Sequence, residues 1–324
     1  MVRLGIVGPG RIVDRVMTDM GNTKEITLYA VASRSMERAR AAAERYHIPR
    51  VYDSYEALAQ DPDVDLVYIA TPHPCHLEQA MLMMRNGKNV LCEKPMTVND
   101  REMQAMIACA RENSVFLMEA MWTRFMPATI KARELVESGA IGEVRHLCGN
   151  FSYPGRYDEN DRVYALNMAG GALLDLGVYP IMEITMFLGW KPEKVTAYAC
   201  KAPTGADMRT SGQMIFKNGA TAQFFCGMDA DADNRMTVYG SKGYLDIEDF
   251  WHATRLVLHE TGKEPQVFAF APENEGHHYE FDHAARCVQE GLKESPVVTL
   301  EESLAISRIC TEMRREMGVV YPMD

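Results

Sequence analysis

The first 120 residues alternate between short apolar runs and amphipathic segments, and this alternation limits the possible folds more than any other feature of the sequence. Apolar runs predict buried strands, and apolar residues at helical spacing between them predict helices. The predicted strands are Val2 to Val7, Ile26 to Ala32, Val51 to Tyr52, Leu66 to Ala70, Val90 to Cys92 and Val115 to Glu119. Because parallel strands need helical crossovers, the pattern predicts a doubly wound parallel sheet, in an α/β domain over residues 1–120.

A glycine turn, Gly8-Pro9-Gly10, joins the first predicted strand to the first predicted helix. Such a turn lets the backbone approach a pyrophosphate, and the helix start offers N–H groups to it. Val13 stands where a third glycine is usual, so the motif alone is not specific. The candidate dinucleotide contacts here are Gly8, Gly10, Arg11 and Ile12.

The end of the second predicted strand indicates which dinucleotide is bound. An NAD enzyme normally has an acid there, which holds the ribose hydroxyls. This chain has Ser33 and Arg34, with Arg38 one turn later. Hydroxyl and guanidinium groups suit a 2′-phosphate, so we predict NADP, with NAD as a possible cofactor. The alternative is that both arginines are solvated residues at a helix start.

Two further loops follow predicted parallel strands, at residues 71–76 and 93–95. Ligands bind above the carboxyl ends of parallel strands, so polar side chains there are candidates for the site. The two histidines of the first loop suggest a metal, but no third ligand lies nearby in the sequence, and we expect no metal. The candidate cofactor contacts in these loops are Thr71, His73, His76, Glu93 and Lys94.

The pattern changes after residue 120, and from residue 143 long strands predominate. The clearest are Glu143 to Tyr153, Lys194 to Cys200, Gly212 to Phe216, Ala220 to Phe225, Arg235 to Tyr239, Gly243 to Ile247, Arg255 to His259 and Gln266 to Phe270. Lys217-Asn218-Gly219-Ala220 predicts a tight hairpin. A long apolar helix, Ala169 to Leu188, interrupts the strands, and a Thr299 to Glu302 capping box begins the last helix. We predict an α+β domain over residues 121–324, built on a large, mostly antiparallel sheet.

One face of that sheet has no obvious helices to cover it. An uncovered apolar sheet face usually finds a partner, so we predict a homodimer through this face.

Composition excludes several classes of partner. The formal net charge of -11 disfavours nucleic acid and anionic membranes. The eight cysteines show no Cys-x-x-Cys and mostly lie in apolar runs, which indicates reduced, buried thiols in a cytoplasmic protein. The most apolar long segment, Ala172 to Trp190, contains Asp175 and Glu183, so we interpret it as a buried helix and not a membrane span. No signal-peptide pattern precedes the first strand.

Taken together, these motifs resemble the glucose-fructose oxidoreductase, inositol dehydrogenase and MocA (GFO/IDH/MocA) family. The resemblance rests on the glycine turn, on Thr71-Pro72-His73 with His76, on Glu93-Lys94-Pro95, and on the run from Gly170 to Tyr179. The string from Glu119 to Phe125, and tyrosine at position 179 where many sugar-acting members have histidine, are similar to the branch of dimeric dihydrodiol dehydrogenases and NADP-dependent D-xylose dehydrogenases. The resemblance implies a Rossmann domain followed by an open-faced sheet domain, a dissociable NADP, and often dimers through the sheet.

Three residues could carry the acid–base chemistry of an alcohol oxidation, which needs a hydride acceptor and a base for the hydroxyl proton. Asp175 and Tyr179 are four residues apart at a predicted helix start, so they share a face. A neighbouring ammonium favours the phenolate form of tyrosine, and Lys94 is the natural donor of that charge. We predict Tyr179 as proton acceptor, Lys94 as its activator and substrate anchor, and Asp175 as an orienting carboxylate that also contacts the substrate. Alternatively, Asp175 and Tyr179 only cap a helix before Pro180.

Aromatic and basic residues of the second domain are candidates for the substrate pocket, because aromatic rings stack on the C–H face of a sugar or on a dihydroarene. They could equally belong to the core. The substrate candidates are Trp122, Phe151, Tyr153, Arg156, Tyr157 and Trp251, and Trp122 and Arg124 are also candidate cofactor contacts.

Three classes of function fit these residues. The first is an NADP-linked dehydrogenase of a cyclic polyol, either an aldose or a trans-dihydrodiol. The second is an NAD-dependent glycosidase of the same architecture, which retains its nicotinamide, whereas Arg34 and Arg38 favour a cofactor that exchanges. The third is a non-catalytic NADP-sensing regulator, which has no need of Lys94, Asp175 and Tyr179 together. We therefore expect the first.

Overall fold

The computed structural model describes residues 1–271 and 275–324, and the chain forms two compact units. Unit 1 contains Met1–Trp122 and a later segment that ends at Leu304. Unit 2 begins at Thr123 and includes the last segment, Ala305–Asp324. The sequence predicted one boundary near residue 120, without this return of the chain to unit 1.

The returning segment joins unit 1 because its apolar side chains complete the core there. The ring of Phe281 packs edge-on against Tyr68, with centroids 5.0 Å apart. Leu300 is buried in the cluster that lies under the helices of the same unit. Local periodicity does not record such a return.

Unit 1 is built on a six-stranded parallel sheet with the order β3-β2-β1-β4-β5-β6. The strands are β1 (Val2–Val7), β2 (Ile26–Ala32), β3 (Arg50–Tyr52), β4 (Leu66–Ile69), β5 (Asn89–Glu93) and β6 (Leu117–Ala120). This order confirms the predicted doubly wound fold, in which the direction of winding reverses between β1 and β4.

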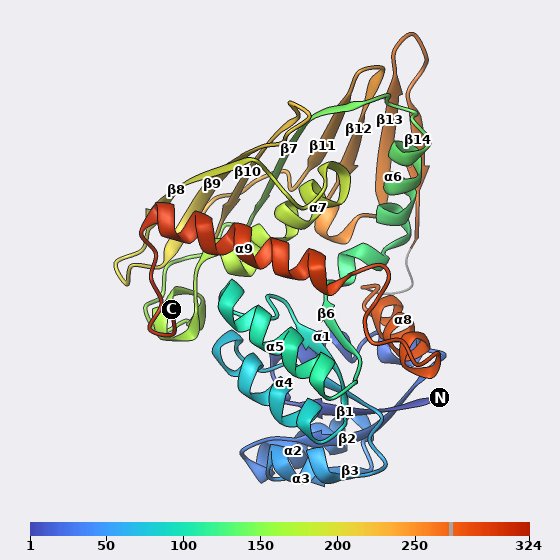
Figure 1. Cartoon of the computed structure of the whole chain (residues 1–324), viewed down its shortest axis with the longest axis vertical. Helices are drawn as coiled ribbons and strands as arrows, with labels where there is room; N and C mark the ends of the chain where they lie inside the picture. The colour runs from blue at the N-terminus through green and yellow to red at the C-terminus, as the bar shows by residue number, and fades with distance from the viewer. Residues whose placement is uncertain (272–274) are drawn as a thin grey trace. The chain divides into compact units, whose positions relative to one another are not determined.

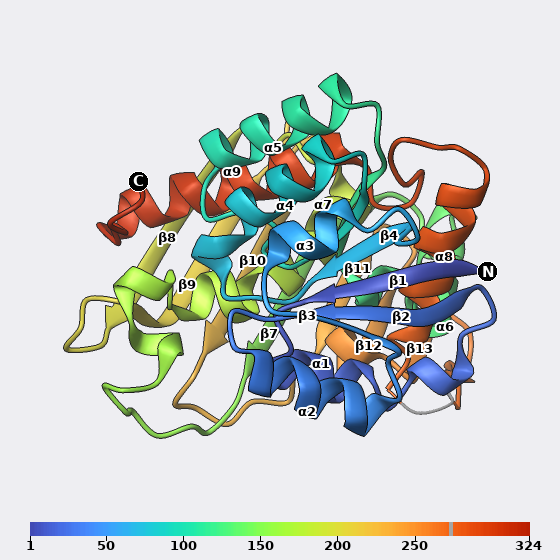
Figure 2. The same cartoon turned by 90° about the horizontal axis from the view of Figure 1, so that it is seen from below.

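Helices cover both faces of this sheet (Figure 2). They are α1 (Arg11–Val16), α2 (Met36–Tyr46), α3 (Tyr55–Gln60), α4 (His76–Arg85), α5 (Asp100–Glu112) and α8 (His278–Gln289). Alternate residues of the strands, such as Ile69 and Cys92, are buried with α3, α4 and α5 on one face. Tyr68 points to the opposite face, where Phe281 of α8 meets it. Strands buried on both faces explain the continuous apolar runs in the sequence.

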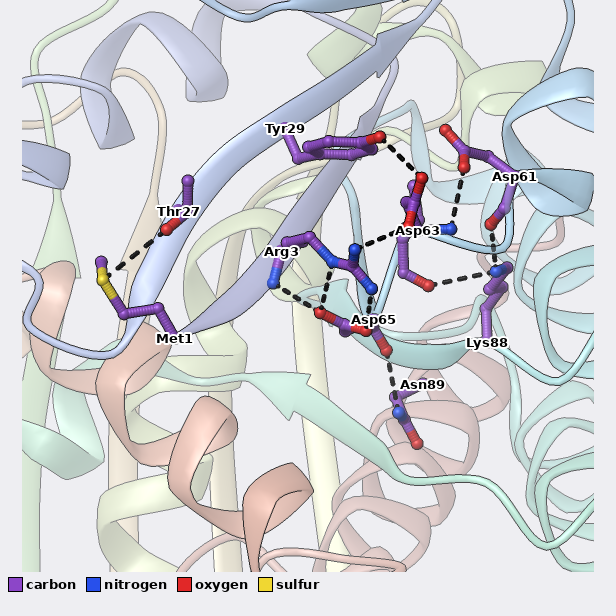
Figure 3. A network of polar contacts seen from close by, with 10 residues as sticks. Met1, Arg3, Thr27, Tyr29, Asp61, Asp63, Asp65, Lys88 and Asn89 are labelled. Carbon is purple, nitrogen blue, oxygen red and sulfur yellow. Dashed lines mark hydrogen bonds and ion pairs between the residues drawn. The ribbon is translucent and has the colours of Figure 1, made fainter.

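Charged side chains connect the amino ends of the strands in unit 1 (Figure 3). The guanidinium of Arg3 on β1 pairs with Asp63 at 2.7 Å and with Asp65 at 3.1 Å. The buried ammonium of Lys88 donates to the carbonyl of Asp61 and, at 3.1 Å, to that of Val64. These contacts hold the segments before β4 and β5 against β1, at the edge opposite the loops that follow the strands.

Unit 2 is built on an eight-stranded sheet with the order β14-β13-β12-β11-β7-β10-β9-β8. The strands are β7 (Val144–Ser152), β8 (Lys194–Lys201), β9 (Asp207–Ile215), β10 (Thr221–Gly227), β11 (Met236–Gly240), β12 (Gly243–Glu248), β13 (Arg255–Glu260) and β14 (Gln266–Ala269). All neighbours are antiparallel except β7 and β10, so the predicted mostly antiparallel sheet is confirmed. The predicted hairpin joins β9 to β10, with Gly219 at φ +81°. Strand β9 begins at Asp207, earlier than the predicted Gly212.

Helices α6 (Pro127–Glu137) and α7 (Val178–Leu188) lie on one face of this sheet (Figure 1). A π-helical turn, Leu173–Gly177, precedes α7 and is called the Leu173 turn below. The long helix predicted from residue 169 is therefore wrong in its first part, because Ala169 is left-handed (φ 53°). The apolar stretch Leu166–Leu188 is long enough to cross a membrane, but 78% of its most apolar window is buried, as in a core helix.

Helix α9 (Leu300–Met317) begins as its capping box predicted. The Thr299 hydroxyl accepts the N–H of Glu302 at 3.2 Å. All eight cysteines are free thiols, and five are buried. Cys200 is exposed, and Cys75 and Cys148 are half-buried, so the expectation of buried thiols is wrong for these three.

The face of the eight-stranded sheet opposite α6 and α7 presents side chains outward. Cross-strand neighbours form an aromatic row there, in which Tyr244 stacks on His259 at 4.1 Å. The row contains His146, Tyr239, Tyr244 and His259. Apolar side chains exposed on the strands are Tyr198 (82%), Ile215 (45%), Tyr239 (41%) and Val267 (55%). The outward face is thus partly apolar within unit 2.

Candidate active site

The glycine turn of unit 1 begins at a residue whose backbone favours glycine. Gly8 has φ +82°, and a Cβ there would lie 2.3 Å from Cγ2 of Thr71. At Gly10 the nearest atoms to a Cβ are two backbone oxygens at 3.9 Å, so the backbone is open to an approaching group. Val13, in place of the usual third glycine, is buried in the core of unit 1. Arg11 is exposed and Ile12 half-buried at the start of α1. Because its backbone is open at Gly10, the turn fits a dinucleotide phosphate.

The end of β2 places hydroxyl and guanidinium groups beside each other in the chain. The Ser33 hydroxyl accepts the N–H of Ser35 at 3.3 Å, and Ser35 in turn caps α2 by accepting the N–H of Arg38. Arg34 is exposed, and its positive charge acts on Tyr55 at the start of α3. Burial raises the pKa of Tyr55, and Arg34 opposes that rise. Tyr55 was not predicted, because no local pattern connects it to residue 34.

The loop at residues 71–76 is tied to the following loop by a histidine. His76 is fully buried, with Nε2 2.7 Å from the carbonyl of Thr71 and Nδ1 3.1 Å from that of Pro95. The Thr71 hydroxyl donates to Gln79 at 2.6 Å. His73 is also buried, with its ring 5.8 Å from that of His76. In residues 1–271 and 275–324, no group of three or more His, Cys, Asp or Glu residues could hold a metal ion.

Glu93 and Lys94 have different surroundings at the end of β5. The Glu93 carboxylate is buried and accepts the hydroxyl of Tyr68. Burial raises the pKa of Glu93, while Tyr68 and Lys94 oppose the rise. Glu280 of α8 is fully buried nearby, and burial and Glu93 raise its pKa well above the ordinary value. Lys94 is half-buried, so only the second residue of the pair reaches the surface of unit 1.

Trp122 lies in unit 1, where a histidine from the returning segment packs on it. Its ring stacks on His277 with centroids 4.3 Å apart. The buried carboxylate of Asp19 accepts the backbone N–H of His277 at 2.6 Å and lies 3.2 Å from its Nδ1. The stack therefore depends on a carboxylate far away in the sequence.

In unit 2, Asp175 and Tyr179 lie on consecutive turns, as their spacing predicted. Asp175 is in the Leu173 turn, 3.7 Å from the guanidinium of Arg162. Tyr179 is buried near the start of α7, with its ring 5.4 Å from Phe151 in an edge contact. Phe151 stacks on Trp251 at 5.2 Å. Unit 2 therefore gathers one tyrosine and one carboxylate beside aromatic rings.

The other predicted pocket residues of unit 2 differ in their surroundings. Arg156 and Tyr157 are exposed, and the ring of Tyr157 packs against Tyr164 at 5.0 Å. Tyr153 is 37% exposed, and its partial burial, followed by the negative charge of Asp175, raises its pKa to about 12. Arg124 is buried.

Two functional candidates were missed by the sequence reasoning. Arg162 begins a short 3₁₀ helix, Arg162–Tyr164, for which the sequence offered no pattern. Glu183 is fully buried, and burial raises its pKa to about 8, with Arg124 opposing. Its position four residues after Tyr179, on the same helix face, was a usable signal.

Comparisons with known proteins agree with this architecture. Residues 2–121 match the oxidoreductase family with an NAD-binding Rossmann fold, and residues 129–246 match the GFO/IDH/MocA C-terminal domain. The trans-1,2-dihydrobenzene-1,2-diol dehydrogenases of Mus musculus and Bos taurus are each 39% identical, over 100% of this chain and 99% of theirs. A 3-ketoreductase from Actinomadura kijaniata, in complex with NADP and TDP-benzene, has a TM-score of 0.87 at 28% identity and covers 98% of both chains. The aldose-aldose oxidoreductase of Caulobacter crescentus, with glycerol, has a TM-score of 0.88 at 27% identity, over 98% and 97% of the chains.

Fold, glycine turn and full-length relatives together define an NAD(P)-dependent oxidoreductase. The chain belongs to the GFO/IDH/MocA family, which confirms the resemblance carried by its sequence motifs.

Stability should depend on pH through Glu183. In the folded chain, burial raises the pKa of Glu183 from its ordinary 4.5 to about 8, so the folded state binds the proton more tightly than the unfolded state. The stability this group contributes is fully present below pH 4.5 and is lost as the pH rises toward 8, with a slope of up to about 1.4 kcal/mol per pH unit. Glu183→Gln should remove that slope in urea unfolding series across this interval. The exposed Glu137→Gln is the control, and parallel pH curves for Glu183→Gln and wild type would contradict the assignment.

Proposed function

We propose that the chain is an NADP-dependent dehydrogenase of a cyclic polyol, either a trans-dihydrodiol or an aldose. The observation that carries this proposal is the group in unit 2 where Tyr179 meets Phe151, which stacks on Trp251, with Asp175 four residues before the tyrosine. A flat aromatic surface suits a dihydroarene ring or the C–H face of a sugar. The full-length similarity to trans-1,2-dihydrobenzene-1,2-diol dehydrogenases favours the dihydrodiol as the first substrate to test.

Each catalytic residue has one role in this proposal. Bound NADP supplies the acceptor for the hydride that leaves the hydroxyl-bearing carbon. Tyr179 takes the hydroxyl proton, and Asp175, paired with Arg162, orients the substrate. Lys94 supplies positive charge that favours the phenolate and anchors the substrate, a role that rests on the sequence and on the family resemblance.

Two alternatives are less well supported. An NAD-dependent glycosidase would retain its cofactor, whereas the exposed Arg34 and Arg38 suit a 2′-phosphate on a cofactor that exchanges. A non-catalytic NADP sensor would not need a tyrosine and a carboxylate on consecutive turns. We propose the cytoplasm as the compartment, consistent with eight free thiols.

We also propose a homodimer through the outward face of the eight-stranded sheet. Tyr198, Ile215, Tyr239 and Val267 expose apolar surface there, and a second copy is the simplest cover for it.

NADP should bind more tightly than NAD, and Arg34→Asp should weaken NADP selectively. The loss should be about one to two orders of magnitude in Kd, the effect of one charged hydrogen bond of about 1.5 to 3 kcal/mol. Titration calorimetry with both cofactors measures it. Arg40→Asp, on the exposed surface of α2, is the charge-matched control and should leave the ratio unchanged. Equal affinity of the wild type for NADP and NAD would contradict the predicted preference for NADP.

Tyr179→Phe should keep the fold and NADP binding but lower turnover by about 10² to 10⁴, the usual contribution of a positioned general base. Wild-type activity is first located by NADPH absorbance with trans-1,2-dihydrobenzene-1,2-diol, D-xylose and D-glucose. The rate of oxidation should rise with pH, with an apparent pKa below the value of about 10 for free tyrosine. Lys94→Met should raise this apparent pKa or abolish the rise.

Tyr164→Phe is the control for the tyrosine substitution, because the buried Tyr164 hydroxyl makes only one long contact within residues 1–271 and 275–324, to the Met228 carbonyl at 3.5 Å. Its turnover should stay within about threefold of the wild type. If Tyr179→Phe turns over at the wild-type rate with the same pH profile, Tyr179 is not the base, and Lys94 or a water that it holds becomes the better candidate.

The dimer should depend on the aromatic row of the sheet. Light scattering should give twice the chain mass for the wild type at micromolar concentration. Tyr239→Lys should give the monomer, because it places a charge in the middle of the row. Ile130→Lys, at an exposed apolar position on α6, should leave the dimer intact. A monomeric wild type, or equal loss in both variants, would refute this interface.

A further inference from the structure

We propose that Asp207 is a positioning residue for the reaction: from β9 its carboxylate holds the Leu173 turn, and thereby orients Asp175 and Tyr179. This inference rests on the proposed function for its catalytic consequence. The contact itself lies entirely within unit 2 and can be tested without turnover.

The carboxylate binds the first N–H group of the turn. Oδ2 of Asp207 accepts the backbone N–H of Leu173 at 2.7 Å and the hydroxyl of Thr210 at 2.8 Å. The preceding residue, Ala172, supplies no side-chain cap. The first N–H groups of a helix lack partners within it and carry positive partial charge, so a carboxylate satisfies both needs.

The contact is also a steric fit. Asp207 is fully buried, and a Cβ atom on Gly171 would lie only 2.0 Å from its Oδ1. Gly171 has φ +145°, so glycine is required there for both space and conformation. At the other end of the turn, a Cβ on Gly177 would lie 3.1 Å from Sγ of Cys226 on β10. The turn therefore touches two neighbouring strands and has little freedom to rotate.

A second contact holds the chain just before the turn. The buried hydroxyl of Tyr321 donates to the carbonyl of Gly170 at 3.0 Å. The guanidinium of Arg314 lies 4.4 Å from the Tyr321 ring and pairs with Asp324 at 2.6 Å. Asp324 also accepts the backbone N–H of Tyr321 at 2.8 Å. The segment after α9 thus clamps the same loop that Asp207 holds.

These contacts bear on the chemistry because Asp175 belongs to the Leu173 turn and Tyr179 follows it on α7. Loss of the Leu173 bond would let the first turn fray, since Ala172 supplies no side-chain cap there. A displacement of about 1 Å in a reacting group can cost about 10²-fold in rate. The orientation of the proposed base would then depend on a carboxylate that touches neither substrate nor cofactor.

The test compares three variants by amide hydrogen exchange and by kinetics. Asp207→Ala should raise exchange of residues 171–179 at least tenfold and lower kcat about 10- to 100-fold, with little change in NADP binding. Asp207→Asn keeps an oxygen acceptor for Leu173 and should restore both within about threefold. Tyr321→Phe removes one hydroxyl and should raise exchange at residues 169–173 without unfolding the protein.

Asp246→Ala is the matched control. Asp246 also accepts a threonine hydroxyl, from Thr237 at 2.7 Å, but on the outward face of the sheet. Exchange in β11 and β12 should rise in this variant, and exchange at residues 171–179 should not. The proposal would be overturned if Asp207→Ala left amide exchange at residues 171–179 unchanged, or raised it equally throughout unit 2. Faster exchange at residues 171–179 with an unchanged kcat would also overturn it. If the wild type turns over no polyol while local fraying is found, the proposed function fails and the anchoring by Asp207 stands.

Discussion

Parallel pairing of the six strands in unit 1 is the constraint on which the rest of the site depends. Each strand must be followed by a crossover on one face of the sheet, so the loops after the strands all lie at one edge. The glycine turn, Ser33 with Arg34, the loop at residues 71–76, and Lys94 each follow a different strand of this sheet. Residues that are far apart in sequence therefore share the edge where a dinucleotide binds in such folds. At the opposite edge, Arg3 and Lys88 hold the strand starts in place (Figure 3).

The buried carboxyl groups follow from a second constraint, the cost of removing charge from water. Glu93, Glu183, Asp207 and Glu280 are all buried, and burial raises the pKa of each. Three of them adjoin predicted functional residues: Glu93 precedes Lys94, Glu183 lies one turn after Tyr179, and Asp207 holds the turn that contains Asp175. Perturbed groups concentrate at functional sites because chemistry needs them there, whereas stability alone would favour apolar residues.

The two faces of the sheet in unit 2 have different surroundings. Apolar residues such as Phe224 and Leu245 point toward α6, α7 and the Leu173 turn, and alternate residues point outward. This one-sided cover explains why the strands read as alternating patterns, in contrast to the continuous runs of unit 1. Gly177, at the end of the Leu173 turn, has no side chain and lets the turn approach β10 closely.

By itself, the sequence determined the order and type of most elements, because period-2 and period-3.6 patterns are local properties of the chain. It therefore predicted both sheets, the hairpin at Gly219 and the capping box at Thr299. The extent of the helix before Tyr179 was wrong, since packing against the sheet, and not apolar composition, sets where that helix starts. Only the tertiary structure decided which distant groups meet: Arg162 with Asp175, His277 with Trp122, and Asp207 with Leu173, 34 residues apart. Periodicity shows which face of an element is buried, but the partner that arrives at that face depends on where the chain returns, and no local pattern encodes that path.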